Sequence, residues 1–343
     1  MLPSMSSSGT VKRRRVSLID GDGIGPEVVA ATVQVLEALG APFEYEHCEA
    51  GTAAVAKHGT NLPRETLESV LRNKLALKGP TGTQIGGGLP SANVGLRKGL
   101  DLYAALRPVK SVDGVKTRYE NVDLVVVREN TESLYTGLEH IVVPGVVESI
   151  KIITEKASTR ISKFGFEHAR KNGRKKVTAV HKANIMKLSD GLFLECARNI
   201  AKEYPDIVYE EVIIDNMCMQ LVRFPERYDV LLMENFYGDI LSDLCAGLVG
   251  GLGVVPGANY GLDCAVFEAV HGTAPDIAGK GLANPTALLM SAVMMLRHLS
   301  METEARRLEA SLRKVYTEGR VKTGDLGGKA TTRDFTDAII QAL

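Results

Sequence analysis

The chain has 343 residues, with 41 Lys and Arg against 41 Asp and Glu, so its formal net charge is zero. Hydrophobic residues make up 45% and charged residues 24%, an ordinary globular composition that excludes disorder as the main state. A neutral balance also argues against a dedicated nucleic-acid-binding protein, which needs a clustered basic excess. Glycine is abundant, at 34 residues, which predicts many tight turns.

The first forty residues predict a strand, a glycine-rich turn and a helix. The strand is Val16–Ile19, the turn is Asp20-Gly-Asp-Gly-Ile-Gly-Pro-Glu27, and the helix runs from Val28 to Leu39 with Pro26 in its first turn. The turn lacks the third glycine of the Rossmann dinucleotide fingerprint, and no Gly-Lys-Ser/Thr of a Walker A motif occurs anywhere. By itself, this turn is weak evidence for any ligand.

Strands and helices then alternate along the rest of the chain, which predicts one compact α/β body. We expect strands at 76–78, 122–127, 177–180, 208–214 and 230–233, and helices at 66–72, 190–203, 239–248, 285–299 and 303–318. The segment Ile141–Ile153 is rich in β-branched residues around Pro144-Gly145, so we expect a hairpin. Its apolar content suggests that something covers it, for example a second subunit.

Signals for secretion, membranes and disulfides are weak. Cys48, Cys196, Cys218, Cys245 and Cys264 form no Cys-x-x-Cys pair, and their odd number argues against a disulfide framework or a zinc site. The longest apolar stretch, 244–256, is cut by glycines and is shorter than the ~20 residues that span a bilayer. Residues 1–15 are Ser-rich and basic, like a frayed arm or the remnant of a mitochondrial presequence. The sequence is therefore compatible with a location in the bacterial cytoplasm or in the mitochondrial matrix.

Three arginines stand close to small hydrogen-bonding residues. Ser91, Asn93 and Arg97 lie together, Arg107 lies at what looks like a strand end before Pro108, and Arg128 follows an apolar strand. Guanidinium groups bind carboxylates through paired hydrogen bonds, so this set suits a multiply anionic ligand. The alternative is solvated surface charge.

Asp239 and Asp243 are four residues apart, on one face of the expected helix. No Lys or Arg lies between residues 229 and 248, so we expect little local neutralisation, which suits Mg²⁺ or Mn²⁺. Asp215, at the end of the expected strand 208–214, is a third candidate ligand. The alternative is that these carboxylates simply face solvent.

The segment from His271 to Asn284 is built of small residues, glycine and proline, so a flat ligand can approach it closely. His271 and Asn284 are candidates for hydrogen bonds to an adenine, and Asp276 for a ribose. A surface turn is the alternative. Lys182 and Tyr135 are possible acid/base groups that spacing alone would not single out.

Taken together, these motifs resemble the β-decarboxylating dehydrogenases, the isocitrate/isopropylmalate dehydrogenase family, and within it the NAD-dependent isocitrate dehydrogenases. The resemblance runs from Ile19 almost to the C-terminus. It is carried by Gly21-Asp-Gly-Ile-Gly-Pro-Glu27, Lys78-Gly-Pro, Leu102-Tyr, Leu106-Arg-Pro108, Arg128-Glu-Asn-Thr-Glu132, His181-Lys-Ala-Asn-Ile-Met186, Tyr237-Gly-Asp-Ile-Leu-Ser-Asp243 and His271-Gly-Thr-Ala-Pro-Asp-Ile-Ala-Gly279.

The resemblance implies an α/β fold with a large and a small domain, unlike a standard Rossmann domain. Residues 1–102 and 251–343 would form the large domain, and residues 103–250 the small one, with a β clasp at about 135–155 that pairs with a second subunit. The active site would lie between the domains and use residues of the partner, so a homodimer is the minimum assembly implied. No nucleic acid or membrane partner is expected.

It also implies the role of each site residue. The substrate carboxylates would be bound by Ser91, Asn93, Arg97, Arg107 and Arg128. The metal ion, Mg²⁺ or Mn²⁺, would be held by Asp239, Asp243 and a second subunit's Asp215. Lys182 of that subunit would help remove the hydroxyl proton, and Tyr135 would protonate the enolate. Cofactor contacts would come from Lys78, Thr83, His271, Gly272, Asp276, Ile277 and Asn284. The implied reaction is oxidative decarboxylation of isocitrate to 2-oxoglutarate and CO₂, with reduction of NAD.

Substrate and cofactor choice rest on two short motifs. Ser91-x-Asn93 is typical of isocitrate dehydrogenases, whereas isopropylmalate dehydrogenases carry an apolar residue here. Asp276-Ile277 stands where bacterial NADP enzymes place Lys-Tyr, so NAD is predicted. Homoisocitrate dehydrogenase and a regulatory subunit of a hetero-oligomer are the alternatives. Two departures from the family pattern lie near the site: Ser133 replaces a usual Gly, and Glu234 a frequent Pro.

Overall fold

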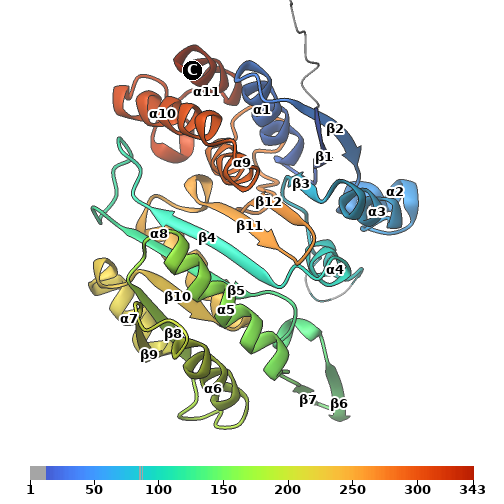
Figure 1. Ribbon diagram of the computed structural model, residues 1–343. Helices are drawn as coiled ribbons and strands as arrows, with labels where there is room; N and C mark the ends of the chain where they lie inside the picture. The colour runs from blue at the N-terminus through green and yellow to red at the C-terminus, as the bar shows by residue number, and fades with distance from the viewer. Residues whose placement is uncertain (1–12, 85, 87) are drawn as a thin grey trace, which may run out of the picture.

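The structure is a computed structural model that describes residues 13–84, 86 and 88–343. A central sheet of ten strands has the order β2-β1-β3-β12-β11-β4-β5-β10-β8-β9 (Figure 1). Its strands are β1 (Arg14–Ile19), β2 (Phe43–Cys48), β3 (Leu75–Lys78), β4 (Ala104–Lys110), β5 (Asp123–Glu129), β8 (Lys176–His181), β9 (Val208–Ile213), β10 (Val230–Met233), β11 (Pro256–Tyr260) and β12 (Ala265–Ala269). Most of the basic N-terminal arm, 1–12, lies outside the described residues.

The sheet consists of two parallel blocks joined by antiparallel strands. Strands β2, β1, β3 and β12 form one block, and β5, β10, β8 and β9 the other. Between them, β11 and β4 run antiparallel to their neighbours. In a dinucleotide-binding Rossmann domain the sheet is mostly parallel throughout, so this topology differs from it, as expected.

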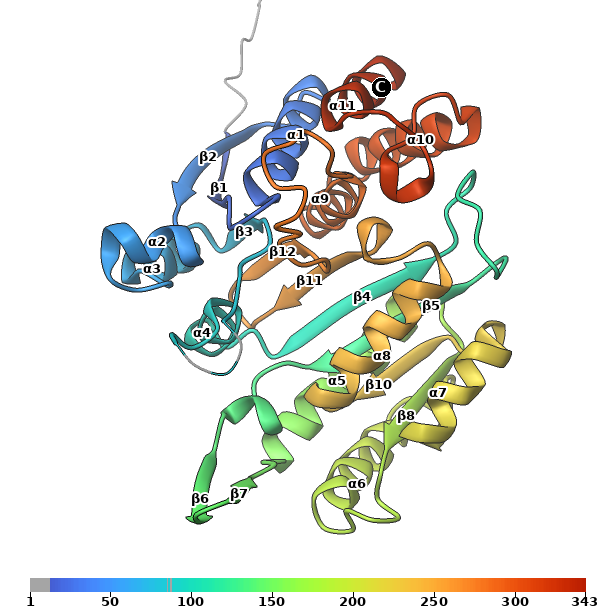
Figure 2. The same ribbon diagram turned by 180° about the vertical axis from the view of Figure 1, so that it is seen from behind.

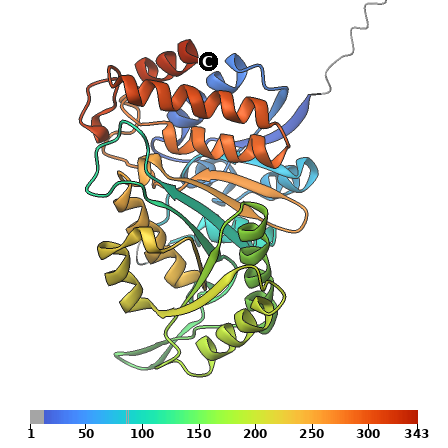
Figure 3. The same cartoon turned by 60° about the vertical axis from the view of Figure 1, so that its left-hand side comes forward.

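Helices cover both faces of the sheet, as Figures 1 and 2 show from opposite sides. They are α1 (Gly25–Ala38), α2 (Thr52–His58), α3 (Arg64–Asn73), α4 (Ala92–Gly99), α5 (Glu155–Lys171), α6 (Ser189–Ala201), α7 (Ile214–Arg223), α8 (Asn235–Leu248), α9 (Thr286–His298), α10 (Glu302–Glu318) and α11 (Thr332–Ala342). Helices α9 and α10 pack side by side at one end of the molecule (Figure 3). Among the described helices, none combines the length and apolarity needed to cross a bilayer.

Burial on both faces explains why the strands are continuously apolar. In β5, Val125 and Val127 pack under α5 and α6, while Leu124 and Val126 face α7 and α8. One buried cluster draws on residues 16–77 and 258–339, and two others on residues 104–255. This distribution is in keeping with a two-domain chain, and the predicted division at residues 102 and 250 stays a prediction.

Each of the expected strands and helices is present, with small shifts of its ends. Helix α8 begins at Asn235, four residues before the expected start at Asp239, and Asp215 lies in the first turn of the unexpected helix α7 rather than at a strand end. The expectation that Arg107 ends a strand was wrong. Arg107 lies in the middle of β4, opposite Val126 of β5. The pairing of β4 with β11 ends at Leu106, so the missing amide hydrogen of Pro108 costs no hydrogen bond on that side, and the strand continues.

The expected hairpin consists of β6 (Glu139–Val143) and β7 (Val146–Ser149), which pair antiparallel. It projects from the end of the molecule near α5 (Figure 1). Both strands are exposed along their whole length, and Ile141 is 72% accessible. Exposed apolar strands of this kind are typical of an interaction surface.

Candidate active site

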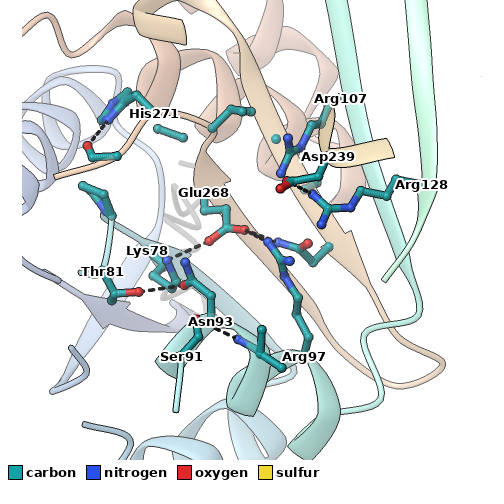
Figure 4. Close-up of a pocket in the computed structure, with 18 of the residues that line it drawn as sticks. Lys78, Thr81, Ser91, Asn93, Arg97, Arg107, Arg128, Asp239, Glu268 and His271 are labelled. Carbon is teal, nitrogen blue, oxygen red and sulfur yellow. Dashed lines mark hydrogen bonds and ion pairs between the residues drawn. The ribbon is translucent and has the colours of Figure 1, made fainter. Parts of the chain in front are cut away.

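A cavity of about 220 Å³ opens between the ends of the two sheet blocks, where β12, β11, β4 and β5 meet helices α4 and α8. Figure 4 shows that charged side chains from opposite sides point into it. The predicted residues that line it are Lys78, Ser91, Asn93, Arg97, Arg107, Arg128, Tyr135, Asp239, His271 and Gly272. Residues almost two hundred positions apart in the chain therefore share one pocket.

Three arginines form the floor of this cavity. Arg97 comes from α4, Arg107 from β4 and Arg128 from β5, and their residues are 8%, 8% and 0% exposed. Burial, reinforced by the charge of Arg128, lowers the pKa of Arg97, and lowers that of Arg107 to about 10. Three buried cations this close together repel one another, and an anionic ligand would relieve that repulsion.

Ser91 and Asn93 lie at the start of α4, on the same helix as Arg97 and across the cavity from Arg107 and Arg128 (Figure 4). Ser91 caps this helix by accepting from the Val94 amide at 3.5 Å, and Thr83 donates to its Oγ at 3.1 Å. The Thr81 hydroxyl donates to Asn93 Oδ1 at 2.8 Å, so the side-chain NH₂ group of Asn93 takes no part in this hydrogen bond. A hydroxyl and an amide thus lie on the side of the cavity that faces the guanidinium groups of Arg107 and Arg128.

The two aspartates lie on α8, next to the arginines. Asp239 forms an ion pair with Arg128 and accepts a hydrogen bond from Tyr135, and Asp243 lies 3.8 Å from Arg107 Nη1. The expectation of little neutralisation was therefore wrong, because β4 and β5 bring cations that the surrounding sequence lacks. Burial alone would raise the pKa of Asp239, but Arg128 lowers it, whereas burial raises that of Asp243.

The carboxylates fit a hard divalent cation only in part. Asp239 and Asp243 supply oxygen ligands of the kind that Mg²⁺ and Mn²⁺ prefer. Within the described part of the chain, however, no group of three His, Cys, Asp or Glu side chains is placed to hold a metal. A complete ligand set would need oxygens from a substrate, water or another chain.

Lys182 and Asp215 lie together but do not line this cavity. Lys182 follows β8, and its Nζ donates to Asp215 Oδ1 at 2.8 Å. The Asp215 carboxylate is largely exposed, and its pKa is lowered by this bond. One chain therefore presents a lysine–aspartate pair on its surface, separate from its own Asp239 and Tyr135.

The predicted cofactor residues divide into two groups. Lys78, His271 and Gly272 line the cavity and Thr83 hydrogen-bonds to Ser91 beside it, whereas Asp276, Ile277 and Asn284 follow along the loop outside it. Burial lowers the pKa of His271, and its Nε2 has no hydrogen-bond partner among the described residues. A buried ring nitrogen without a partner points to a ligand contact.

Asn284 already uses its side chain within the protein. Its Nδ2 donates to Asp325 at 2.9 Å and lies 3.4 Å from the Tyr316 hydroxyl, and its Oδ1 accepts from the Thr286 amide at 3.0 Å. These bonds hold the end of the loop against the start of α9.

Glu268 is a site residue that the sequence analysis missed. From the end of β12 it accepts hydrogen bonds from Lys78 at 2.7 Å and Asn259 at 2.7 Å, and lies 3.5 Å from Arg97. Burial would raise its pKa, but Lys78 and Arg97 lower it. The available signal was a single acidic residue inside the otherwise apolar run Ala265–Ala269.

Comparison with known proteins agrees with this geometry. Residues 15–339 match the model of the isocitrate/isopropylmalate dehydrogenase family. The chain belongs to this family. The predicted fold class, an isocitrate/isopropylmalate dehydrogenase-like fold, is therefore confirmed.

Family members with similar sequences carry both catalytic and regulatory names. The chain is 55% identical over 328 residues to the mitochondrial isocitrate dehydrogenase [NAD] catalytic subunit 5 of Arabidopsis thaliana, covering 95% of this chain and 88% of that protein. It is 54% identical over 338 residues to a mitochondrial isocitrate dehydrogenase [NAD] regulatory subunit of Dictyostelium discoideum, covering 98% and 94%. The crystal structure of isocitrate dehydrogenase from Methylococcus capsulatus superposes with a TM-score of 0.94 at 51% identity, covering 96% and 99%.

The two departures from the family pattern have clear structural effects. Ser133 adopts φ 69° and ψ −144°, a conformation that suits glycine, and its buried Oγ has no partner in the described chain. Glu234 caps α8 by accepting from the amides of Phe236 at 2.9 Å and Tyr237 at 3.2 Å.

Glu234 also belongs to a buried charged cluster beside the site. Lys151 Nζ lies 2.6 Å from Asp190 Oδ1 and 3.5 Å from Glu234 Oε1, and these three side chains are 12%, 2% and 3% exposed. Asp190 further accepts from the Lys182 amide at 2.6 Å and the Tyr237 hydroxyl at 3.0 Å. The Lys151 cluster thus ties the end of the hairpin to α8 and to the turn that carries Lys182.

Proposed function

We propose that this protein oxidises isocitrate to 2-oxoglutarate and CO₂ and reduces NAD, with Mg²⁺ or Mn²⁺. The observation that carries the proposal is the set of three buried arginines that line one cavity together with Ser91 and Asn93. Asp239, Asp243 and Glu268 lie near these cations, and the paired hydrogen bonds that guanidinium groups offer suit the carboxylates of a tricarboxylate. The names of the similar Arabidopsis and Methylococcus proteins support the same substrate and, for the first, the same cofactor.

Ser91 and Asn93 are the proposed specificity residues. Opposite the arginines, a hydroxyl and an amide can both hydrogen-bond a third carboxylate, whereas an isopropyl group there would leave them unpaired. An unpaired buried polar group costs about 1–3 kcal/mol, so isopropylmalate should be discriminated against strongly. Homoisocitrate, one methylene longer, is the substrate alternative.

The side chains of the cavity would bind the substrate and move its protons. Arg97, Arg107 and Arg128 would orient the carboxylates, and Asp239 and Asp243 would hold the divalent cation. When bound, NAD accepts the hydride and the cation acts as a Lewis acid towards the substrate oxygens. Tyr135 would donate a proton to the carbon that loses CO₂. Burial and its bond to Asp239 raise the pKa of its hydroxyl, which supports a role as a proton donor.

Lys182 and Asp215 would act in the site of a second copy of the chain. They form a pair on the surface, and exposed apolar side chains surround this region, with Leu188 at 91% and Ile185 at 70% accessibility. The exposed hairpin β6–β7 would pair with the same copy. Shared sites of this kind make a homodimer the smallest active unit, and a hetero-oligomer with a related subunit would use the same surfaces.

A regulatory rather than catalytic role is the alternative, because a similar protein carries that name. The presence of Tyr135, Lys182, Asp215, Asp239 and Asp243 favours a catalyst. We expect the mitochondrial matrix if the source is a eukaryote, since the similar Arabidopsis and Dictyostelium proteins are mitochondrial, and the cytoplasm if the source is a bacterium.

The test is to follow nicotinamide reduction by purified protein with Mg²⁺ or Mn²⁺, using isocitrate, homoisocitrate or isopropylmalate, each with NAD or NADP. We expect turnover with isocitrate and NAD. Absence of that turnover refutes the proposal, and preference for homoisocitrate selects the alternative substrate.

Mixing two inactive variants tests the shared site. In a mixture of Lys182→Met and Asp239→Asn chains, half of the dimers are mixed and each has one intact site, so about a quarter of wild-type activity should return. If each site were built from one chain, mixing would restore nothing.

A further inference from the structure

The glycine-rich turn at the start of α1 precedes a helix, a position that often binds a phosphate. Three of its amides are already used within the protein: Asp22 N donates to Pro80 O at 2.7 Å, Ile24 N to Thr273 O at 2.9 Å, and Gly25 N to Asp22 O at 2.9 Å. Ile24 and Gly25 are also buried. These contacts indicate a structural purpose for the turn.

That purpose is indicated by Glu27, the last residue of the turn motif. Its Oε1 accepts from the Ala283 amide at 2.8 Å and its Oε2 from the Gly281 amide at 3.2 Å. The Thr332 hydroxyl, at the start of α11, lies between Oε1 and Ala283 O, 2.6 Å from the latter, and shares its single hydrogen between these two acceptors. One side chain from the start of the chain thus binds two amides of the loop 271–284.

The other end of the same loop contacts the same turn. Thr273 O accepts from Ile24, and a Cβ on Gly23 would lie 2.0 Å from that oxygen, so this close approach requires glycine. The turn therefore holds the loop at two points, near Thr273 and near Gly281. The loop is also held by the bonds of Asn284 and by the Thr332 amide, which donates to Gly281 O at 2.8 Å, whereas Gly279 and Gly281 have positive φ and no neighbouring atoms around the place of a Cβ.

A carboxylate is the group that this arrangement needs. Three donors converge on two oxygens, and only a carboxylate offers acceptors at both positions without carrying a hydrogen of its own. A glutamine would place an NH₂ group against one of the loop amides, which leaves that half-buried amide without a partner.

We propose that Glu27 is a positioning residue for the cofactor loop, and that the glycine-rich turn shapes this loop instead of binding the cofactor. The inference rests on the proposed NAD function, since it assigns the loop 271–284 to the nicotinamide adenine dinucleotide. Among the described residues, no hydrogen bond or ion pair joins Glu27 to the arginine and aspartate side chains of the substrate pocket, so we expect Glu27 to act mainly on cofactor binding.

The experiment compares Glu27→Gln with Glu37→Gln, an exposed glutamate on the same helix that serves as matched control. NADH affinity is measured by fluorescence and isocitrate affinity by calorimetry with Mn²⁺. For Glu27→Gln we expect the Kd of NADH and the KM of NAD to rise about tenfold or more, while kcat and the KM of isocitrate change less than twofold. Glu27→Asp, which reaches fewer donors, should lie between.

Hydrogen exchange of the loop in protein without ligands separates this inference from the proposed function. Glu27→Gln should exchange the amides of residues 279–284 faster than wild type and than Glu37→Gln. Unchanged exchange, or equal weakening of NADH and isocitrate binding, overturns the positioning role. If the wild type reduces no nicotinamide yet the exchange responds as expected, the positioning of the loop holds and only its assignment to NAD fails.

Discussion

Removing the cation of the Lys151 cluster should destabilise the protein severely. In Lys151→Met a side chain of similar length loses its charge, and two buried carboxylates, Asp190 and Glu234, are left without their shared counter-ion. Surface ion pairs are weak because water screens them, but here all three side chains are at least 88% buried by accessible area.

The expected cost follows from that burial. Breaking a buried ion pair by removing one partner costs about 3–5 kcal/mol, because a desolvated charge is left uncompensated. For a chain of 343 residues, an unfolding entropy of about 2.1 cal/mol/K per residue converts this cost into a drop of about 4–7 °C in the unfolding midpoint. This is a large share of the roughly 5–15 kcal/mol that stabilises a typical protein.

Calorimetry on three variants provides the measurement. Lys57→Met is the control, because Lys57 makes an exposed pair with Glu49 at 3.0 Å and should lose less than about 1 kcal/mol. Lys151→Met/Asp190→Asn leaves only one bare carboxylate and should be more stable than Lys151→Met alone, although it carries one more substitution. The amide oxygen introduced at position 190 can still accept the hydrogen bonds that the Lys182 amide and the Tyr237 hydroxyl donate to Asp190. A loss no larger than that of the control, or a double variant less stable than the single one, would refute the reasoning.

Three further outcomes are expected. Ser133→Gly should stabilise the protein by about 1–2 kcal/mol more than Ser133→Ala in urea unfolding, because both variants remove the unpaired buried hydroxyl but only glycine relieves the positive φ. Burial lowers the pKa of His168 to about 4, whereas the unfolded chain binds this proton below about pH 6.5. As pH falls from 7 to 4.5, mainly the unfolded chain gains the proton, so the free energy of unfolding of the wild type should fall by about 2–3 kcal/mol more than that of His168→Gln. Asp276→Lys with Ile277→Tyr should lower kcat/KM for NAD and admit NADP, and an unchanged preference for NAD would place cofactor specificity elsewhere.

The order of the structural elements could be predicted because it depends on local pattern. Apolar runs such as Val122–Val127 are continuous when both faces of a sheet are covered, and the amphipathic helix at 190–203 shows its period directly. The ends of elements were less predictable. Helix α8 begins at Asn235 because the Glu234 side chain caps it, and the sequence Met233-Glu-Asn235 does not predict this contact.

Site residues were found where several motifs belong to one known family, and were missed where a single side chain acts alone. Glu268 looks like one charge within an apolar strand until Lys78 and Arg97 meet it in space. Lys151 looks like any surface lysine until Asp190 and Glu234 enclose it.

The sequence by itself determined the α/β class, the family and the identity of most polar groups in the cavity, because these depend on patterns and motifs that are continuous in the chain. The zero net charge shows nothing of how those groups are arranged. Tertiary structure alone decided which charges meet: Asp239 with Arg128, 111 positions away, and Glu27 with Ala283, 256 positions away. The physical reason is that Coulomb and hydrogen-bond energies depend on distance and burial, and both are set only when distant strands and loops pack together.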